Sequence, residues 1–283
     1  MLDIRWLAFD LDRTIIGPDR VLRERTNEVL RRAVDSGYKL IFASGRPPRS
    51  IRYLIEQVGR EIAFVAYNGG YAEAPDGERL CDHRMDASTA QRILDTMRLG
   101  EPGAILMECN DAFHYDEEND FSLTHIKRWP HQPASIGMLD YTLRSGVNKF
   151  LAIGSPENIT RTEKKLYAHV ADQEIIRPTL YKETELDFIE VMPRGITKKI
   201  GIDAILGRFG WKWSAGIAFG DAINDVSMME NAKVSIAVED SAEEVLAIAT
   251  QTCGSAREEG VAIWLENFLD TMAAQRAKQK EIA

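Results

Sequence analysis

Cysteine is scarce in this chain, and its spacing excludes two classes of protein. The 283 residues include only three cysteines, Cys81, Cys109 and Cys253, which lie far apart and are odd in number. They fit neither a disulfide framework nor a zinc site, so we expect a reducing, cytoplasmic location. Also absent are any run of roughly 18 apolar residues, as a membrane span requires, and a recognisable signal peptide.

Positive charge is also in short supply, which argues against a nucleic-acid partner. The net charge is −9, from 35 lysines and arginines against 44 aspartates and glutamates. General nucleic-acid binders display a basic face. A small phosphorylated metabolite bound in a locally positive cleft remains compatible with an acidic protein. We expect no membrane partner, and either a monomer or a homodimer.

The order of apolar and helical segments predicts an α/β fold with two parts. Alternating strands and helices near both ends of the chain are typical of a Rossmann-like parallel sheet. This rhythm breaks near residue 83 and returns after about residue 188, with paired strands and helices between. We therefore predict a core domain from residues 1–82 and 189–283, and an inserted α+β cap domain at residues 83–188. Ser241 with Glu244, and Ser255 with Glu258, match the capping-box pattern at the start of the last two predicted helices.

Two aspartates follow the first predicted strand. The stretch "WLAFDLDRTII" is apolar on both faces up to Phe9, as in a buried strand, and then continues with Asp10 and Asp12. Carboxylates are costly to bury unless another group pairs with them. Because ligands of open parallel sheets bind at the carboxyl ends of the strands, these aspartates are candidate site residues.

Other polar motifs occupy similar positions along the chain. They are "ASGR" (Ser44, Gly45, Arg46), "YNGG" (Asn68, Gly69), "GITKK" (Lys198) and "GDAIND" (Asp221, Asn224, Asp225). Singly, each has an ordinary interpretation as a turn, a helix cap or a surface lysine. Together, the four aspartates would concentrate negative charge that a hard cation, Mg²⁺, would balance. The Ser44 hydroxyl and the Lys198 ammonium suit phosphate oxygens, so the set predicts a phosphoryl-transfer site.

These segments resemble, in their order, the four motifs of the haloacid dehalogenase (HAD) superfamily. The match is to its Cof-type sugar-phosphatase branch, which has a large cap between the second and third motifs, and "YNGG" is similar to a substrate loop of that branch. The resemblance covers nearly the whole chain, although the cap matches only by position and length.

The resemblance implies a mechanism and a role for each motif residue. Asp10 would be the nucleophile and Asp12 the general acid and base. The metal set would be the Asp10 side chain, the Asp12 backbone carbonyl and Asp221, with Asp225 close by. The implied phosphate and substrate residues are Ser44, Gly45, Arg46, Asn68, Gly69, Lys198 and Asn224. The implied activity is a Mg²⁺-dependent phosphatase that hydrolyses a small phosphorylated metabolite, such as a sugar phosphate, through an aspartyl phosphate.

Two alternatives use the same motifs. A phosphomutase or phosphotransferase would return the phosphoryl group to a hydroxyl of the substrate, and a non-catalytic regulator would only sense a phosphometabolite. A regulator would be expected to lose Asp10 or Asp12, and both are present. Arg13 and Lys199 stand where the branch commonly has glycine. Both would add positive charge at the mouth of the site or lie on the solvated surface.

Overall fold

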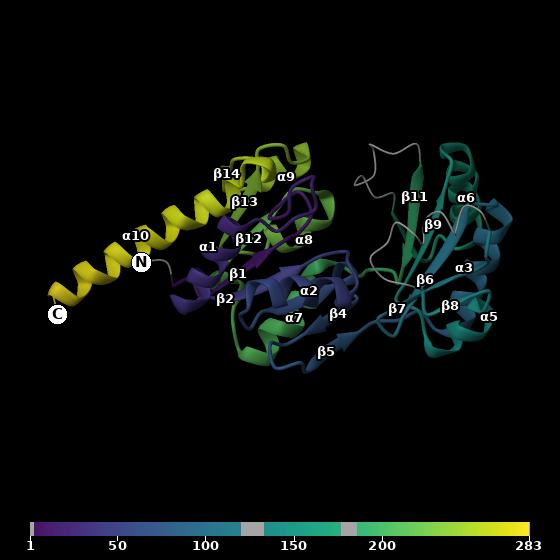
Figure 1. Ribbon diagram of the computed structural model, residues 1–283, viewed down its shortest axis with the longest axis horizontal. Helices are drawn as coiled ribbons and strands as arrows, with labels where there is room; N and C mark the ends of the chain where they lie inside the picture. The colour runs from purple at the N-terminus through teal and green to yellow at the C-terminus, as the bar shows by residue number, and fades with distance from the viewer. Residues whose placement is uncertain (1–2, 120–132, 177–185, 283) are drawn as a thin grey trace. The chain divides into compact units, whose positions relative to one another are not determined.

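A computed structural model describes residues 3–119, 133–176 and 186–282 (Figure 1). The chain divides into two units, one formed by Met1–Cys81 with Thr197–Ala283 and the other by Asp82–Ile196. The second boundary lies at Ile196 rather than at residue 188. The reason is β11 (Asp187–Met192), which pairs with β9 (Lys149–Gly154) and therefore belongs to the sheet of the second unit.

The first unit is built on one sheet with the strand order β14-β13-β12-β1-β2-β3-β4-β5. The six strands from β14 to β3 run parallel, and β4 is antiparallel to β3. Their bounds are β1 Trp6–Phe9, β2 Lys39–Ala43, β3 Ala63–Ala66, β4 Tyr71–Glu73, β5 Arg79–Asp82, β12 Gly216–Gly220, β13 Val234–Val238 and β14 Gln251–Cys253. The predicted Rossmann-like core thus has an added edge, β4 and β5, that the sequence analysis missed.

Helices cover both faces of this sheet. The face with α1 (Glu24–Asp35), α2 (Pro48–Val58) and α10 (Gly260–Ile282) buries phenylalanines of four strands: Phe9, Phe42, Phe64 and Phe219. The face with α7 (Lys198–Phe209), α8 (Val226–Met229) and α9 (Glu243–Ile248) carries alanines of the same strands: Ala8, Ala43, Ala63 and Ala218. Because side chains alternate along a strand, large residues fill one layer and small ones let α7 approach the other.

Both predicted capping boxes are wrong. Helix α9 begins after Ala242, and the Ser241 hydroxyl donates instead to the carbonyl oxygen of Val238 at 2.6 Å. Ser255 precedes a short 3-10 turn, Ala256–Glu258, and makes no side-chain cap there. In both places the backbone forms a turn where the sequence pattern predicted a capped helix start.

The second unit has a six-stranded sheet with the order β10-β11-β9-β6-β7-β8. The strands not yet given are β6 Ala104–Cys109, β7 Ala112–Tyr115, β8 Ser135–Ile136 and β10 Glu174–Ile176. Helices α3 (Ala87–Gly100) and α6 (Pro156–His169) pack on one face, and a short helix, α5, spans Leu139–Thr142. A separate apolar cluster that includes Leu106, Leu151 and Phe188 lies on the other face.

None of the helices in the described parts of the chain combines the length and the apolar character that crossing a bilayer requires.

Candidate active site

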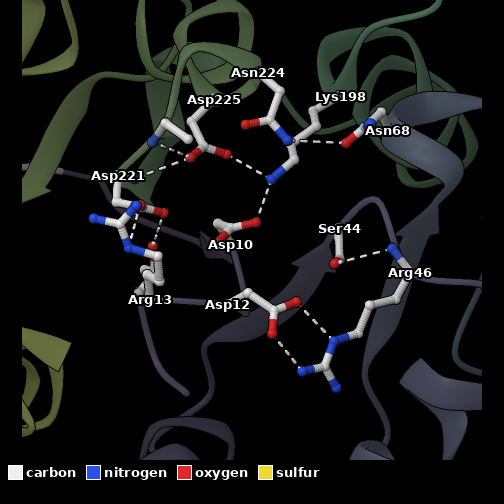
Figure 2. A network of polar contacts seen from close by, with 12 residues as sticks. Asp10, Asp12, Arg13, Ser44, Arg46, Asn68, Lys198, Asp221, Asn224 and Asp225 are labelled. Carbon is white, nitrogen blue, oxygen red and sulfur yellow. Dashed lines mark hydrogen bonds and ion pairs between the residues drawn. The ribbon is translucent and has the colours of Figure 1, made fainter. Parts of the chain in front are cut away.

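Three motifs meet at one edge of the core sheet. Asp10, Ser44 and Asp221 directly follow β1, β2 and β12, which are neighbouring parallel strands. The Asp10 N–H donates to the Phe219 carbonyl oxygen at 2.9 Å, which extends the pairing of β1 and β12 up to the site. The structure therefore brings these side chains together through the parallel register of the strands (Figure 2).

Lys198 links two of the aspartates. Its side chain is fully buried at the first residue of α7. The Nζ atom donates to the Asp10 carboxylate and, at 2.5 Å, to Oδ1 of Asp225. These contacts exclude the interpretation of Lys198 as an ordinary surface lysine.

Gly69 explains how the "YNGG" segment supports this lysine. It has a φ of +117°, and a Cβ added there would lie 1.9 Å from the carbonyl oxygen of Thr197, the residue before Lys198. Only glycine combines that backbone conformation with such a close approach. The loop after β3 therefore packs directly on the first turn of α7.

The Asp221–Asp225 segment closes on itself around the Asp225 carboxylate. Oδ2 of Asp225 accepts the backbone N–H groups of Asp221 at 2.9 Å and of Ala222 at 3.0 Å. Thr14 donates its hydroxyl to Oδ1 of Asp221 at 3.2 Å. With three donors on Asp225, we infer that this residue mainly holds Lys198 and the turn in place.

The cluster carries more negative charge than the lysine balances. Oxygens of Asp10, Asp221 and Asp225 lie within 4.8 Å of one another, and all three residues are buried. Burial raises the pKa of Asp10 well above its usual range and, with the nearby Asp225, raises the pKa of Asp221 to about 7. Although burial acts in the opposite direction, the charges of Asp10 and Asp225 raise the pKa of Lys198, so the ammonium stays charged. A compact set of carboxylate oxygens with excess negative charge suits a hard divalent cation.

Asp12 lies outside this carboxylate cluster and has a partner of its own. Arg46 donates from Nε to Oδ2 of Asp12 at 2.7 Å and from Nη2 to Oδ1 at 2.5 Å. Figure 2 shows the two side chains facing each other. Such a bidentate pair fixes the orientation of the carboxylate. The sequence analysis grouped Arg46 with the phosphate-binding residues and gave no sign of this pairing.

The remaining predicted residues lie around the same loops. The Ser44 hydroxyl oxygen accepts the Arg46 backbone N–H at 3.2 Å, and Gly45, between them, packs against the Asn68 side chain. Asn224 donates from Nδ2 to Oδ1 of Asn68 at 3.0 Å, which joins the loops after β3 and β12.

The two departures from the motif pattern, Arg13 and Lys199, have different surroundings. The Nε atom of Arg13 lies 3.6 Å from Oδ2 of Asp221. Lys199 instead pairs with Asp203 at 2.5 Å, and its Nζ lies 5.7 Å from the ring centroid of Trp213. The contacts of Lys199 are therefore on the outer side of α7. Of the two residues, Arg13 is the one that can add positive charge at the mouth of the site.

A parallel α/β core with strand-end carboxylates around a buried lysine, interrupted by an inserted α+β unit, defines a class of hydrolytic enzymes with an insertion in the core. The chain belongs to the haloacid dehalogenase-like hydrolase family, whose profile matches residues 7–265. The resemblance predicted from the motifs is thereby confirmed.

Curated relatives and solved structures match over almost the full length. A 5-amino-6-(5-phospho-D-ribitylamino)uracil phosphatase of Bacillus subtilis is 24% identical, covering 93% of this chain and 96% of its own. An HMP-PP phosphatase of Cronobacter sakazakii is 26% identical, covering 93% and 95%. A crystal structure from Thermotoga maritima superposes with a TM-score of 0.83 at 20% identity, covering 93% and 97%. The structural match confirms the predicted fold class.

Proposed function

We propose that this protein is a Mg²⁺-dependent phosphatase that hydrolyses a small phosphorylated metabolite, such as a sugar phosphate, through an aspartyl phosphate on Asp10. The observation that carries the proposal is the buried contact of Lys198 with both Asp10 and Asp225, beside Asp221. A phosphate dianion repels a carboxylate nucleophile, and this arrangement offers the Lys198 ammonium and a place for a divalent cation to offset that repulsion. The two curated relatives described above are phosphatases by name, which supports a phosphoric monoester hydrolase.

The proposed first step uses Asp10 and Asp12. An ionised carboxylate attacks phosphorus without a base to activate it. Burial raises the pKa of Asp10, and the Lys198 ammonium together with a bound cation would favour its ionised form. As the bond between Asp10 and phosphorus forms, the ester P–O bond breaks, and Asp12, which enters this step in its protonated form, gives that proton to the leaving oxygen. In the second step, Asp12 takes a proton from the water that attacks phosphorus, and the bond to Asp10 breaks. Phosphate and free Asp10 result.

The residues assigned to the metal are Asp10 and Asp221, with the Asp12 backbone carbonyl as the resemblance implies. Mg²⁺, when bound, would supply positive charge to the phosphoryl oxygens. Lys198 would bind a phosphoryl oxygen from its fixed position between Asp10 and Asp225. Ser44 would donate its hydroxyl to another oxygen, and Asn68 and Asn224 would keep the surrounding loops in register.

Phosphate release from a panel of esters tests this proposal. We expect the protein to release phosphate from at least one sugar phosphate, sugar-acid phosphate, nucleotide or cofactor phosphate in the presence of Mg²⁺. Excess chelator should abolish release, and added Mg²⁺ should restore it. Full activity in chelator would remove the metal from the mechanism. Transfer of the phosphoryl group to a sugar hydroxyl, instead of release, would identify a mutase or transferase.

Arg46 is the residue we expect to orient Asp12 for proton transfer. Arg46→Lys keeps the charge but loses the two-point contact, and a misdirected catalytic group costs on the order of 10²-fold in rate. We therefore expect kcat to fall by about that factor for alkyl phosphates, whose leaving oxygen needs a proton. An activated aryl ester should be much less affected. An equal loss on both kinds of ester, with a raised KM, would instead assign Arg46 to the phosphate.

We further propose that the second unit acts as a cap that selects the leaving group. Its sheet carries an ion pair in which Lys149 Nζ donates to Oε1 of Glu190 at 2.8 Å. Both residues alternate with the helix-covered positions of β9 and β11, so they lie on the opposite face of the sheet. The two side chains are only 9% and 14% exposed, and charged groups with so little exposure discriminate strongly among the polar ligands that they contact.

Glu190→Gln tests this division of roles, because it removes a charge while keeping the shape of the side chain. We expect it to change the relative kcat/KM of different phosphate esters by about tenfold, the effect of one hydrogen bond to a charged group. Ser44→Ala should lower kcat/KM for all esters alike, since they share the phosphoryl group. The reverse pattern across a substrate panel would contradict the assignment.

A further inference from the structure

Arg13 brings a permanent positive charge to Asp221. Its Nε lies 3.6 Å from Oδ2 of that carboxylate, and its Nη2 donates to the Asp240 carbonyl oxygen at 3.4 Å. Figure 2 shows the guanidinium directed at Asp221. The side chain thus bridges the loops that follow β1, β12 and β13, on the same carboxylate that we assign to the metal.

The backbone at Arg13 has a conformation that costs free energy for any residue with a side chain. Its φ is +66°, in the left-handed region that glycine adopts at no steric cost and that other residues disfavour. Hydrogen bonds hold it there, from Arg13 N–H to the Ile16 carbonyl oxygen at 2.8 Å and from Ile16 N–H to that of Leu11, also at 2.8 Å. The same conformation occurs at Arg20, so the case for a function of the Arg13 side chain rests on where this strain lies, beside the Asp221 carboxylate.

The guanidinium also changes the charge of the carboxylate cluster. In the fully ionised state that binds a cation, Asp10, Asp221 and Asp225 with Lys198 alone carry two net negative charges, whereas Lys198 and Arg13 together leave one. A unit charge about 5 Å from a divalent ion, screened as in water, changes the affinity by roughly tenfold. Because the side chain is 40% exposed and borders a cavity with Pro18, Ser255 and Arg257, it has room to move aside.

We propose that Arg13 is a built-in counter-charge of the metal site, which holds Asp221 in place before the cation arrives and weakens Mg²⁺ binding. The inference rests on the proposed metal site and adds a determinant of its affinity. A weaker site is half-filled at a higher Mg²⁺ concentration, so Arg13 would raise the concentration range over which the occupancy of the site changes. Arg13 is a positioning residue, since its contacts described above are with Asp221 and the Asp240 backbone.

Calorimetric titration of the whole protein with Mg²⁺, at low ionic strength and without substrate, tests the inference. We expect Arg13→Gly and Arg13→Asn, which are neutral and tolerate a positive φ, to bind Mg²⁺ about tenfold more tightly than the wild type. Arg13→Lys, which keeps the charge, should stay within about threefold of the wild type. Added salt should reduce the differences because it screens the charge.

Arg20 offers a matched control in the same loop. It is also an arginine with a positive φ, of 60°, and Arg20→Gly should relieve a similar backbone strain without changing the Mg²⁺ affinity. Unchanged or weaker Mg²⁺ binding by both neutral Arg13 variants would overturn the inference while leaving the metal site intact. Tighter binding by Arg20→Gly to the same extent would also overturn it. If neither the wild type nor any variant binds Mg²⁺, the metal site itself is overturned, and the inference with it.

Discussion

Asp10→Asn should abolish turnover, with a fall in kcat of about 10⁴-fold or more, as is usual when a catalytic nucleophile is removed. The amide is nearly isosteric with the carboxylate but is a poor nucleophile, so the aspartyl phosphate cannot form. The measurement is phosphate release together with trapping of the phosphoenzyme by rapid acid quench. Near-normal rates on every ester would require the covalent mechanism to be abandoned.

This variant should remain folded, which makes the result interpretable. Lys198 keeps its contact with Asp225 when Asp10 loses its charge, and removal of a buried carboxylate with a raised pKa relieves a desolvation cost. Asp12→Asn is the matched control two residues away. It should cripple turnover of alkyl phosphates but still permit phosphoryl transfer from an activated aryl ester, because that leaving group needs no proton.

Lys198→Met should both destabilise the first unit and lower the rate for every ester. The substitution leaves the buried carboxylates of Asp10 and Asp225 without their shared ammonium. Loss of one partner of a buried ion pair typically costs about 3–5 kcal/mol in the free energy of unfolding. We expect a loss of that size in chelator and a partial recovery in Mg²⁺, since the cation would supply the missing charge.

Chemical denaturation followed by tryptophan fluorescence measures this effect, because four tryptophans report on the first unit: Trp6, Trp211, Trp213 and Trp264. Lys199→Met is the control at the next residue. That side chain is 36% exposed and pairs with Asp203, so its loss should cost less than about 1 kcal/mol. Equal stabilities of the two variants would show that the buried lysine contributes no more than a surface one.

Elements with marked ends were predictable from the sequence. Helices α2 and α7 span Pro48–Val58 and Lys198–Phe209, and residues typical of helix ends flank both. Each ends at a glycine in the left-handed conformation, Gly59 and Gly210, and α2 also begins on a proline. The short strands β4 and β5 were missed because three or four residues, partly exposed, carry too little alternation to be recognised.

The gathering of the site residues was predictable, but their pairing was not. Parallel strands end at one edge, so Asp10, Ser44 and Asp221 had to come together once the strands were assigned. The contacts of Arg46 with Asp12 and of Asp225 with two backbone N–H groups depend on how loops fold against one another, which has no period in the sequence. The second domain boundary was misplaced for a related reason, because β11 is apolar enough to resemble a core strand.

The strand order of the core has a consequence for biosynthesis. Strand β1 lies between β2, which is made soon after it, and β12, which begins at Gly216. The ribosome therefore synthesises the contiguous second unit, Asp82–Ile196, before β1 can pair with β12. Contacts between residues so distant along the chain form late, because the intervening segment must first be closed into a loop. During synthesis Asp10 can therefore meet Lys198 and Asp221 only after most of the protein has been made.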